Sequence, residues 1–206
     1  MSLSKQYIIA GISTEVGKTV ISAVITEKLQ ADYWKPIQAG DLHQSDSIKV
    51  GQWISNPKSR IHTEGFKLNH PMSPHAAADL DQIHIGLDDL QIPETSNPLI
   101  VELAGGIMVP INHDITNLDF IKSAQLPVVL VVNFYLGSIN HTLLSIKCLQ
   151  ESHVDIVGLV FNGNINPESK EVILKMSGCK NLGEVPQIET DITPEIIRDY
   201  GKYIQF

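Results

Sequence analysis

The 206-residue sequence has few cysteines, few charges and no long apolar run. Its two cysteines, Cys148 and Cys179, do not form a CxxC spacing, which predicts two reduced, buried thiols in a cytoplasmic protein. The longest apolar run, residues 126–132, is far shorter than the ~20 residues that cross a bilayer, so we expect no membrane partner. The 15 basic residues against 23 acidic ones give a net charge of −8. This charge argues against a nucleic-acid partner, because phosphate contacts need clustered Lys and Arg.

Length and composition predict one folded domain that spans residues 1–206. Hydrophobic residues make up 43% of the chain, close to the roughly 45–50% of ordinary globular domains. A chain of this size buries about 70% of its unfolded surface, so a full core is expected without disulfides or structural metals.

Short apolar runs alternate with segments of helical periodicity along the chain. We predict strands at residues 7–10, 33–37, 99–103, 128–133, 156–161 and 181–185, and helices at residues 20–29, 46–54, 75–80, 118–124, 139–152, 167–176 and 194–200. Continuous β-branched runs are typical of strands that are covered on both faces. The alternation predicts an α/β fold with a parallel sheet and helices on both sides. Residues 38–97, rich in His, Pro, Asn and Asp, predict surface and site loops rather than sheet.

A glycine-containing segment joins the first predicted strand to the first predicted helix. Its sequence, G-I-S-T-E-V-G-K-T at residues 11–19, is typical of a phosphate-binding loop in that position. Gly17 lets the backbone approach an anion closely, and the N–H groups of residues 16–19 would point at phosphate oxygens. Lys18 would reach the β- and γ-phosphates, and the Thr19 hydroxyl would bind Mg²⁺.

The loop departs from the usual pattern by one residue. Five residues rather than four separate Gly11 from Gly17, so we interpret Gly11 as the end of the strand and residues 15–19 as an intact cradle. The variant also places the Glu15 carboxylate inside the loop. A carboxylate near phosphates is unfavourable unless it meets a metal, a cation or an amine.

Three further polar side chains stand at predicted strand or helix ends. Lys35 follows the second predicted strand, at the sheet edge where ligands bind in open α/β folds. Glu102 ends the apolar run before residues 104–106; it matches a Walker B acid that contacts Mg²⁺, although an ordinary polar strand end looks the same. Asp46 opens a predicted helix and is either a site residue or a helix cap.

Seven short motifs occur along the chain in the same order as in one protein family. They are T-E-V-G-K-T at 14–19, K-P-I-Q-A-G at 35–40, S-D at 45–46, S-P-H at 73–75, V-E-L-A-G-G at 101–106, L-G-S-I-N-H at 136–141 and G-E-V-P at 183–186. The chain resembles the ATP-dependent dethiobiotin synthetases of the P-loop NTPase superfamily, and the resemblance covers nearly the whole chain. It implies a single-domain P-loop NTPase-like parallel sheet with helices on both faces.

The resemblance also implies a reaction. Enzymes of this family are ligases that use ATP and Mg²⁺ to convert 7,8-diaminopelargonate and CO₂ to dethiobiotin in biotin biosynthesis. CO₂ adds to one amine to give a carbamate, and a carbamate oxygen takes the γ-phosphoryl group of ATP to give a carbamic–phosphoric anhydride. The second amine then closes the ureido ring and releases phosphate. The implied enzyme is cytoplasmic and homodimeric.

The resemblance implies roles for the matching positions of this sequence. Lys35 and Lys18 match catalytic lysines, and Thr19, Asp46 and Glu102 match Mg²⁺ ligands. The implied nucleotide-binding positions are Thr14, Glu15, Val16, Gly17, Lys18, Thr19, Asp46, Glu102, Leu103, Ala104, Gly105, Asn162, Gly163, Pro186, Gln187 and Ile188. The implied substrate positions are Ala39 and, for the carboxyl tail, Gly137, Ser138, Ile139 and Asn140 of a neighbouring subunit.

Three positions depart from the family pattern. Ala39 replaces a serine, Leu103 replaces a glycine, and Gly163 replaces the aspartate that usually follows the asparagine at position 162. Leu103 needs negative φ, and its side chain narrows the space in which a glycine would let a phosphate approach. These departures bear on the details of the substrate site more than on the type of reaction.

Two other functions share parts of this pattern. A related ATP-dependent amide-forming synthetase domain would usually accompany a glutaminase domain with a nucleophilic cysteine, and neither Cys148 nor Cys179 stands in a suitable turn. A nucleotide-dependent switch ATPase would favour an extra lysine before the cradle, and residues 12–16 contain none. The ligase is therefore the favoured hypothesis.

Overall fold

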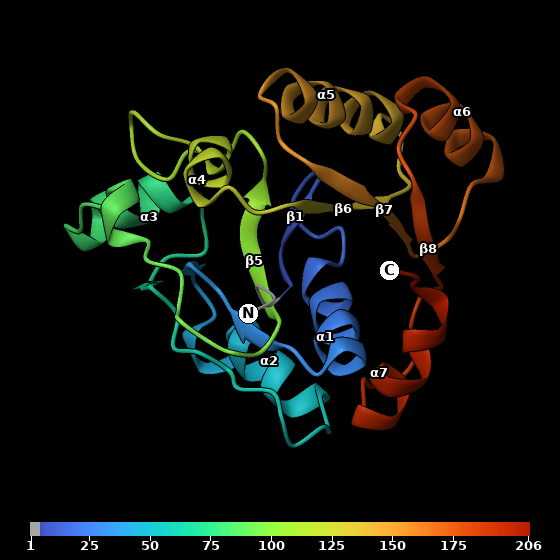
Figure 1. Ribbon diagram of the computed structural model, residues 1–206. Coiled ribbons are helices and arrows are strands. Elements are labelled where there is room, and N and C mark those ends of the chain that lie inside the picture. Colours follow the sequence, from blue (N-terminus) through green and yellow to red (C-terminus); the bar gives the residue numbers. More distant parts are fainter. Residues whose placement is uncertain (1–4) are drawn as a thin grey trace.

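A six-stranded parallel sheet forms the centre of the computed structural model, which describes residues 5–206 (Figure 1). Its strand order is β2-β5-β1-β6-β7-β8. The strands are β1 (Gln6–Gly11), β2 (Asp32–Trp34), β5 (Leu99–Gly106), β6 (Val128–Asn133), β7 (Ile156–Asn162) and β8 (Asn181–Val185). All neighbouring strands of this sheet run parallel, so the predicted sheet is confirmed.

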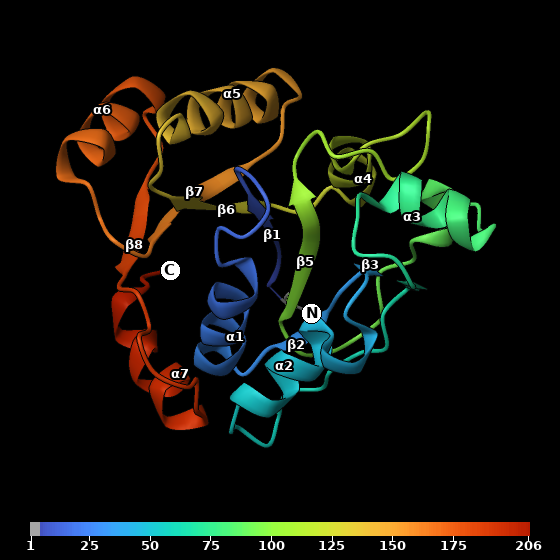
Figure 2. The same ribbon diagram turned by 180° about the vertical axis from the view of Figure 1, so that it is seen from behind.

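Helices cover both faces of the sheet, as predicted (Figures 1 and 2). Within residues 5–206 they are α1 (Lys18–Leu29), α2 (Asp46–Trp53), α3 (Pro74–Asp81), α4 (Asn117–Ala124), α5 (Ser138–Glu151), α6 (Pro167–Ser177) and α7 (Pro194–Tyr200), with 3₁₀ helices η1 (Leu42–Gln44), η2 (Leu87–Asp89) and η3 (Gly201–Tyr203). α5 packs against α6 on one face, and α1 packs against α2 and α7 on the other. None of the helices described is long and apolar enough to cross a membrane.

The central strands are buried because they are apolar on both faces. Ile8 and Ile9 of β1 and residues 128–132 of β6 are fully buried. Continuous apolar runs of this kind suit a strand with helices above and below it. Cys148 and Cys179 are free, as predicted, but they are half-buried rather than buried.

Residues 37–68 contain a second, smaller sheet that the sequence analysis did not predict. β3 (Ile37–Ala39) pairs in parallel with β4 (Phe66–Leu68). The predicted strand at residues 33–37 is therefore wrong as one element, because β2 ends at Trp34, Pro36 follows, and β3 begins at Ile37 in the smaller sheet. Proline has no N–H for the ladder, so it ends pairing with β5 and lets the chain start a new strand.

The register of β2, β5 and β1 brings the predicted site residues to one edge of the sheet. Glu102 of β5 is the register partner of Ile9 in β1, and Val101 is the partner of Trp34 in β2. Lys35 follows directly after β2, and the loop that leads into α1 follows directly after β1. All three chain segments therefore leave the sheet at its carboxyl edge, where α/β folds bind ligands.

Asp32, the first residue of β2, is fully buried at the opposite, amino edge of the sheet, where its carboxylate joins residues 60–62 to residues 95–97. Its carboxylate accepts hydrogen bonds from the backbone N–H of Arg60 at 2.9 Å, the Thr95 hydroxyl at 2.7 Å and the Asn97 amide at 2.8 Å. Nε2 of His62 lies 3.0 Å from the same carboxylate. Burial alone would raise the pKa of Asp32, but the hydrogen bonds from Asn97 and Thr95 outweigh it and lower the pKa below its usual value. The ionised carboxylate thus fixes the start of β2.

We expect Asp32→Ala to lower the free energy of unfolding at pH 7 by about 3 kcal/mol, because several buried donors lose their acceptor. The folded-state pKa is depressed, so this stabilisation is present above the unfolded-state pKa of about 3.9 and is lost as the pH falls through the folded-state pKa. Urea unfolding at pH 7 and pH 3 measures both effects, with the exposed Asp155→Ala as the matched control. An equal loss at the two pH values would contradict the role of the ionised carboxylate.

Candidate active site

The phosphate loop has the backbone conformation that its glycine requires. Gly17, the N-cap of α1, has φ +89°, and a Cβ atom there would lie 2.1 Å from Nδ2 of Asn162. That amide nitrogen donates a hydrogen bond to the carbonyl oxygen of Val16 at 3.0 Å. The end of β7 therefore braces the loop, and glycine at position 17 leaves room for the brace. α1 begins at Lys18, two residues earlier than predicted.

Lys18 is a buried cation at the start of α1. Its Nζ donates a hydrogen bond to the carbonyl oxygen of Ser13 at 2.9 Å, inside the loop. Burial, and then the nearby charge of Lys35, lower the pKa of Lys18 to about 8. A cation held in this way at a helix N-terminus is suited to an anionic ligand.

Lys35 joins the two predicted metal-binding acids. Its buried Nζ donates to Oδ2 of Asp46 at 2.5 Å and to Oε1 of Glu102 at 3.0 Å. Burial would lower the pKa of Lys35, but the charges of Glu102 and Asp46 outweigh it and raise the pKa. Burial would raise the pKa of Asp46, but Lys35 outweighs it and lowers the pKa. The lysine and Asp46 are therefore both charged.

Glu102 carries two further hydrogen bonds. The Thr19 hydroxyl donates to Oε1 at 2.9 Å, and the Tyr33 hydroxyl donates to Oε2 at 2.9 Å. Burial, and then the charge of Glu102, raise the pKa of Tyr33 well above its usual value, so its hydroxyl remains a donor. The carboxylate thus connects α1, β2 and β5.

The residues proposed for Mg²⁺ fit a hard cation. Thr19, Asp46 and Glu102 supply hydroxyl and carboxylate oxygens, which Mg²⁺ prefers. Lys35 bridges the carboxylates of Asp46 and Glu102, and the Thr19 hydroxyl bonds to Glu102, so the three groups lie close together. In the part of the chain that the structure describes, no group of three or more His, Cys, Asp or Glu residues could hold a metal. A cation at this place would therefore need the Thr19 hydroxyl and further oxygens from water or phosphate.

A cleft of about 850 Å³ opens above these residues. The predicted positions that line it are Thr14, Glu15, Gly17, Lys18, Thr19, Lys35, Ala39, Asp46, Glu102, Ala104 and Gly105. The predicted positions outside this lining are Val16, Leu103, Asn162, Gly163, Pro186, Gln187, Ile188, Gly137, Ser138, Ile139 and Asn140. The structure therefore brings together the phosphate, metal and lysine positions in one cleft, and it leaves the remaining predicted positions outside the cleft lining.

The predicted base-binding positions gather on the other flank of the phosphate loop. A Cβ atom at Gly163 would lie 3.3 Å from Oε1 of Gln187 and 3.4 Å from Oδ1 of Asn133. Asn133 and Asn162 are register partners at the ends of β6 and β7. The carboxamides of Gln187 and Asn133 thus lie beside Gly163, where a larger side chain would crowd them.

Residues 137–140 begin α5. Gly137 has φ +101° as its N-cap, and Ser138 is buried, but Leu136 before them is fully exposed. Residues 137–140 lie outside the cleft lining of their own chain.

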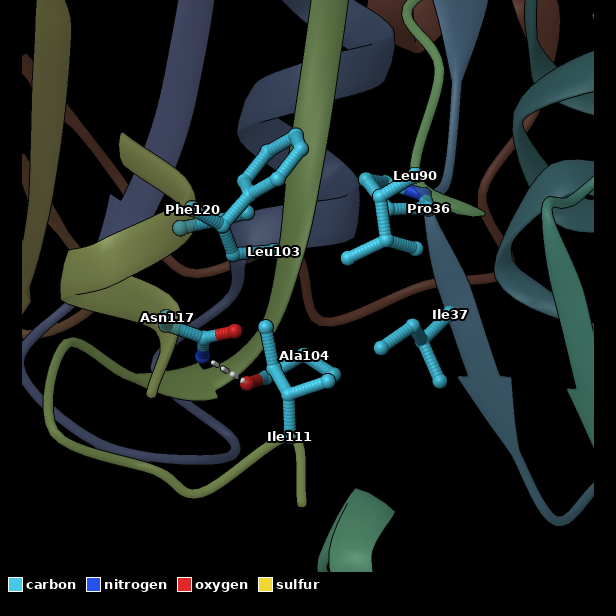
Figure 3. A pocket seen from close by; sticks show the side chains of 8 residues that line it. All are labelled: Pro36, Ile37, Leu90, Leu103, Ala104, Ile111, Asn117 and Phe120. Atoms are coloured by element: carbon cyan, nitrogen blue, oxygen red, sulfur yellow. Dashed lines mark hydrogen bonds between the residues drawn. The ribbon is translucent and has the colours of Figure 1, made fainter. Parts of the chain in front are cut away.

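Leu103 is buried at 2% exposure and lies beneath the cleft rather than in its lining. It borders a cavity of about 10 Å³ with Pro36, Ile37, Leu90, Ala104, Ile111, Asn117 and Phe120 (Figure 3). Nδ2 of Asn117 donates to the carbonyl oxygens of Ala104 at 2.7 Å and Gly106 at 2.8 Å, and so fixes the end of β5. The prediction that the Leu103 side chain narrows the phosphate space is therefore wrong, because the side chain is buried outside the cleft lining.

Several residues that support the site were not predicted from the sequence. Oε1 of Gln38 accepts the backbone N–H of Asp46 at 3.1 Å, and its Nε2 donates to the carbonyl oxygen of Gly40 at 3.0 Å. Nζ of Lys49 lies 3.9 Å from Oδ1 of Asp46 on the same helix. The i, i+3 spacing of Asp46 and Lys49 is a signal in the sequence for that pair, whereas the Gln38 and Asn117 contacts depend on tertiary structure.

Comparison with known proteins first identifies the fold. A family model described as an AAA domain matches residues 5–195. The fold is similar to the MinC:MinD cell division protein complex of Aquifex aeolicus, with a TM-score of 0.57 and 14% identity over 96% of this chain and 86% of that chain. It is also similar to a ParA family ATPase from Chlorobium tepidum, with a TM-score of 0.51 and 13% identity over 98% and 99% of the two chains. These likenesses show the P-loop NTPase-like fold alone.

Sequence relatives identify the family. The ATP-dependent dethiobiotin synthetase BioD of Christiangramia forsetii is 45% identical over 97% of this chain and 96% of that protein. The protein of the same name from Cytophaga hutchinsonii is 45% identical over 96% and 95% of the two chains. The similarity extends over nearly the full length of each protein, and the chain belongs to the ATP-dependent dethiobiotin synthetase family.

Proposed function

We propose that the chain is a C–N ligase of biotin biosynthesis that uses ATP to form dethiobiotin from 7,8-diaminopelargonate and CO₂. The observation that carries the proposal is the buried cluster in which Lys35 contacts both Asp46 and Glu102. This cluster lies in one cleft with Lys18 and Thr19 of the phosphate loop. It offers a second lysine and an acid pair beside a phosphate cradle, which is what phosphoryl transfer to a carbamate needs.

The reaction follows three steps on this proposal. One amine of the diamine attacks CO₂ and loses a proton, which gives a carbamate. A carbamate oxygen then attacks the γ-phosphorus of ATP, with ADP as the leaving group, and a carbamic–phosphoric anhydride forms. The second amine attacks the carbamoyl carbon, the C–O bond to phosphate breaks, and the ureido ring closes.

The two lysines stabilise the negative charge of these species. Lys18, with a pKa of about 8, is mostly protonated at pH 7 and would exchange its bond to the Ser13 carbonyl for phosphate oxygens. Lys35 stays protonated beside its acids and faces the cleft, where carbamate and γ-phosphate oxygens would gather. Fixed positive charge in a partly buried site is the main electrostatic aid to phosphoryl transfer.

Thr19, Asp46 and Glu102 would hold Mg²⁺, which would neutralise charge on phosphate oxygens. Gln38 fixes the backbone of Asp46 and thereby orients that acid. Glu15 is exposed on the cleft lining, so its carboxylate would meet a substrate ammonium group or a ribose hydroxyl.

Substrate recognition completes the proposal. Asn162, Gly163 and residues 186–188 would hold the nucleotide base, because carboxamides can both donate to and accept from a purine edge. Residues 137–140 would bind the substrate carboxylate at the N-terminus of α5. Since these four residues lie outside the cleft lining of their own chain, we assign them to the cleft of a second copy. Ala39 lines the cleft without the hydroxyl of the usual serine.

A homodimer is supported by exposed apolar side chains around α5. Leu136 is fully exposed, Leu144 is 58% exposed and Met108 is 60% exposed. Sγ of Cys148 on α5 lies 3.7 Å from Sδ of Met108, so the loop after β5 reaches the same helix. Such a surface, directly beside residues 137–140, favours a second copy of the chain as its partner. We also retain the cytoplasmic location as a prediction.

Product formation tests the function. We expect the purified chain with ATP, Mg²⁺, bicarbonate and 7,8-diaminopelargonate to form dethiobiotin, detected by mass spectrometry, and we expect omission of the diamine to abolish the product. Binding of ATP without any dethiobiotin would contradict the ligase. Slow ATP hydrolysis that is indifferent to the diamine would instead indicate a switch ATPase.

Substitution of the two lysines separates their roles. We expect Lys35→Ala to lower kcat at least about 1000-fold but to change the Kd of ATP only a few-fold, because Lys35 acts on the transferring group. Lys18→Ala should raise the Kd of ATP strongly, because Lys18 lies in the cradle. Calorimetry and steady-state kinetics check both expectations. A loss of ATP affinity in Lys35→Ala as large as that in Lys18→Ala would reject this assignment.

The dimer has its own test. Light scattering after gel filtration should give about twice the chain mass, and Leu144→Asp should raise the dimer dissociation constant about 100-fold because it buries a charge in an apolar contact. Met176→Asp, at an equally exposed position on α6, is the matched control and should leave the dimer intact. A wild-type monomer that forms product at full rate would contradict the shared substrate site.

A further inference from the structure

Glu102 is 1% exposed, and its two carboxylate oxygens have different partners. Oε1 accepts hydrogen bonds from Thr19 and Lys35, both of which line the cleft. Oε2 accepts the hydrogen bond of Tyr33, at 2.9 Å, on the side away from these two residues. Tyr33 is fully buried and lies outside the cleft lining. Oε1 of Glu102 therefore bonds residues of the cleft, and Oε2 bonds a residue of the core.

The strand register explains why Tyr33 reaches this oxygen. Tyr33 of β2 is the register partner of Ile100 in β5, and Trp34 is the partner of Val101. Side chains two residues apart on a strand share a face, so Ile100 and Glu102 lie on one face of β5, and Tyr33 stands beside Ile100 in the register. The long phenol side chain reaches diagonally to Oε2 of Glu102 on the neighbouring strand, while Lys35 donates to Oε1.

We propose that Tyr33 is a positioning residue, whose hydroxyl holds Oε2 of Glu102 so that Oε1 faces Thr19 and the divalent cation bound with the nucleotide. The proposal rests on the proposed function, because it assumes that Glu102 contacts this cation. Tyr33 itself touches neither substrate nor metal. It acts through Glu102, because a residue that hydrogen-bonds a metal-binding carboxylate fixes the orientation of that carboxylate.

Without the hydrogen bond from Tyr33, the carboxylate group of Glu102 would no longer be held in one orientation. Lys35 and Thr19 both act on Oε1, so they restrain one oxygen and leave the other to Tyr33. Without the Tyr33 hydroxyl, Oε2 would be a buried, charged acceptor with no donor from the phenol, which is energetically unfavourable. The carboxylate would then rotate toward other donors. The cost would therefore fall on cation binding and not on the phosphate cradle, which Tyr33 does not contact.

The test compares nucleotide binding with and without magnesium. Calorimetry measures the Kd of adenylyl imidodiphosphate, a non-hydrolysable ATP analogue, in the presence of Mg²⁺ and in the presence of EDTA. For Tyr33→Phe we expect the Kd with Mg²⁺ to rise about 10- to 100-fold and the Kd in EDTA to stay within about twofold of the wild type. Tyr7→Phe, at a half-buried position on β1 of the same sheet, is the matched control and should change neither value.

Two results would overturn the inference. One is a Tyr33→Phe protein that binds the magnesium-loaded analogue as tightly as the wild type. The other is an equal loss with Mg²⁺ and with EDTA, which would indicate a merely structural role. A wild-type protein whose affinity does not depend on Mg²⁺ would instead refute the metal site of the proposed function.

A second variant covers the case in which Tyr33→Phe does not fold. p-Aminophenylalanine at position 33 keeps the ring and an N–H donor in place of the hydroxyl. We expect it to bind the magnesium-loaded analogue within about threefold of the wild type, because the donor is retained. A loss of more than about tenfold in a folded protein of this kind would contradict the donor role.

Discussion

The buried carboxylate of Glu102 is the constraint on which the site depends. A charge removed from water is stable only when its oxygens are paired, and a missing partner is costly. Thr19 of α1, Tyr33 of β2 and Lys35 after β2 supply these partners, and Asp46 at the start of α2 shares the lysine. One side chain thus sets the relative positions of the phosphate loop, the edge strand and the helix with the second acid.

Sequence reasoning found the elements whose signals are local. The phosphate loop, the parallel sheet and the acid carried by β5 follow from motif spacing and continuous apolar runs, and the structure contains all of them, although β5 continues past its predicted end at residue 103 to Gly106. β3 and β4 were missed because strands of three residues show no periodicity. Tyr33, Gln38 and Asn117 were missed because their partners lie on other strands, loops or helices, which spacing along the chain does not reveal. The register that pairs Tyr33 with Ile100 had to be known before its hydroxyl could be placed.

The fold and the chemistry of this chain come from different residues. The MinD and ParA structures share the parallel sheet and its helices at 13–14% identity, so the scaffold by itself does not specify a reaction. The proposed ligase chemistry depends on a few side chains at the carboxyl edge of β2 and β5, above all Lys35 between two acids. The proposed base and carboxylate positions lie outside that cleft lining, at the ends of β7 and β8 and at the start of α5. Asn162 contacts the phosphate loop of its own chain, so only residues 137–140 are assigned to the cleft of a second copy.

The most direct test of this account is a crystal structure of the chain with magnesium and a non-hydrolysable ATP analogue. The account predicts a cation that contacts oxygens of Thr19 and of at least one of Asp46 and Glu102, with the phosphates in the cradle of residues 15–19. It also predicts that Lys35 stays in the cleft, within hydrogen-bond reach of an acid or the γ-phosphate. Nucleotide bound elsewhere, or a cation that contacts none of the three residues, would contradict it.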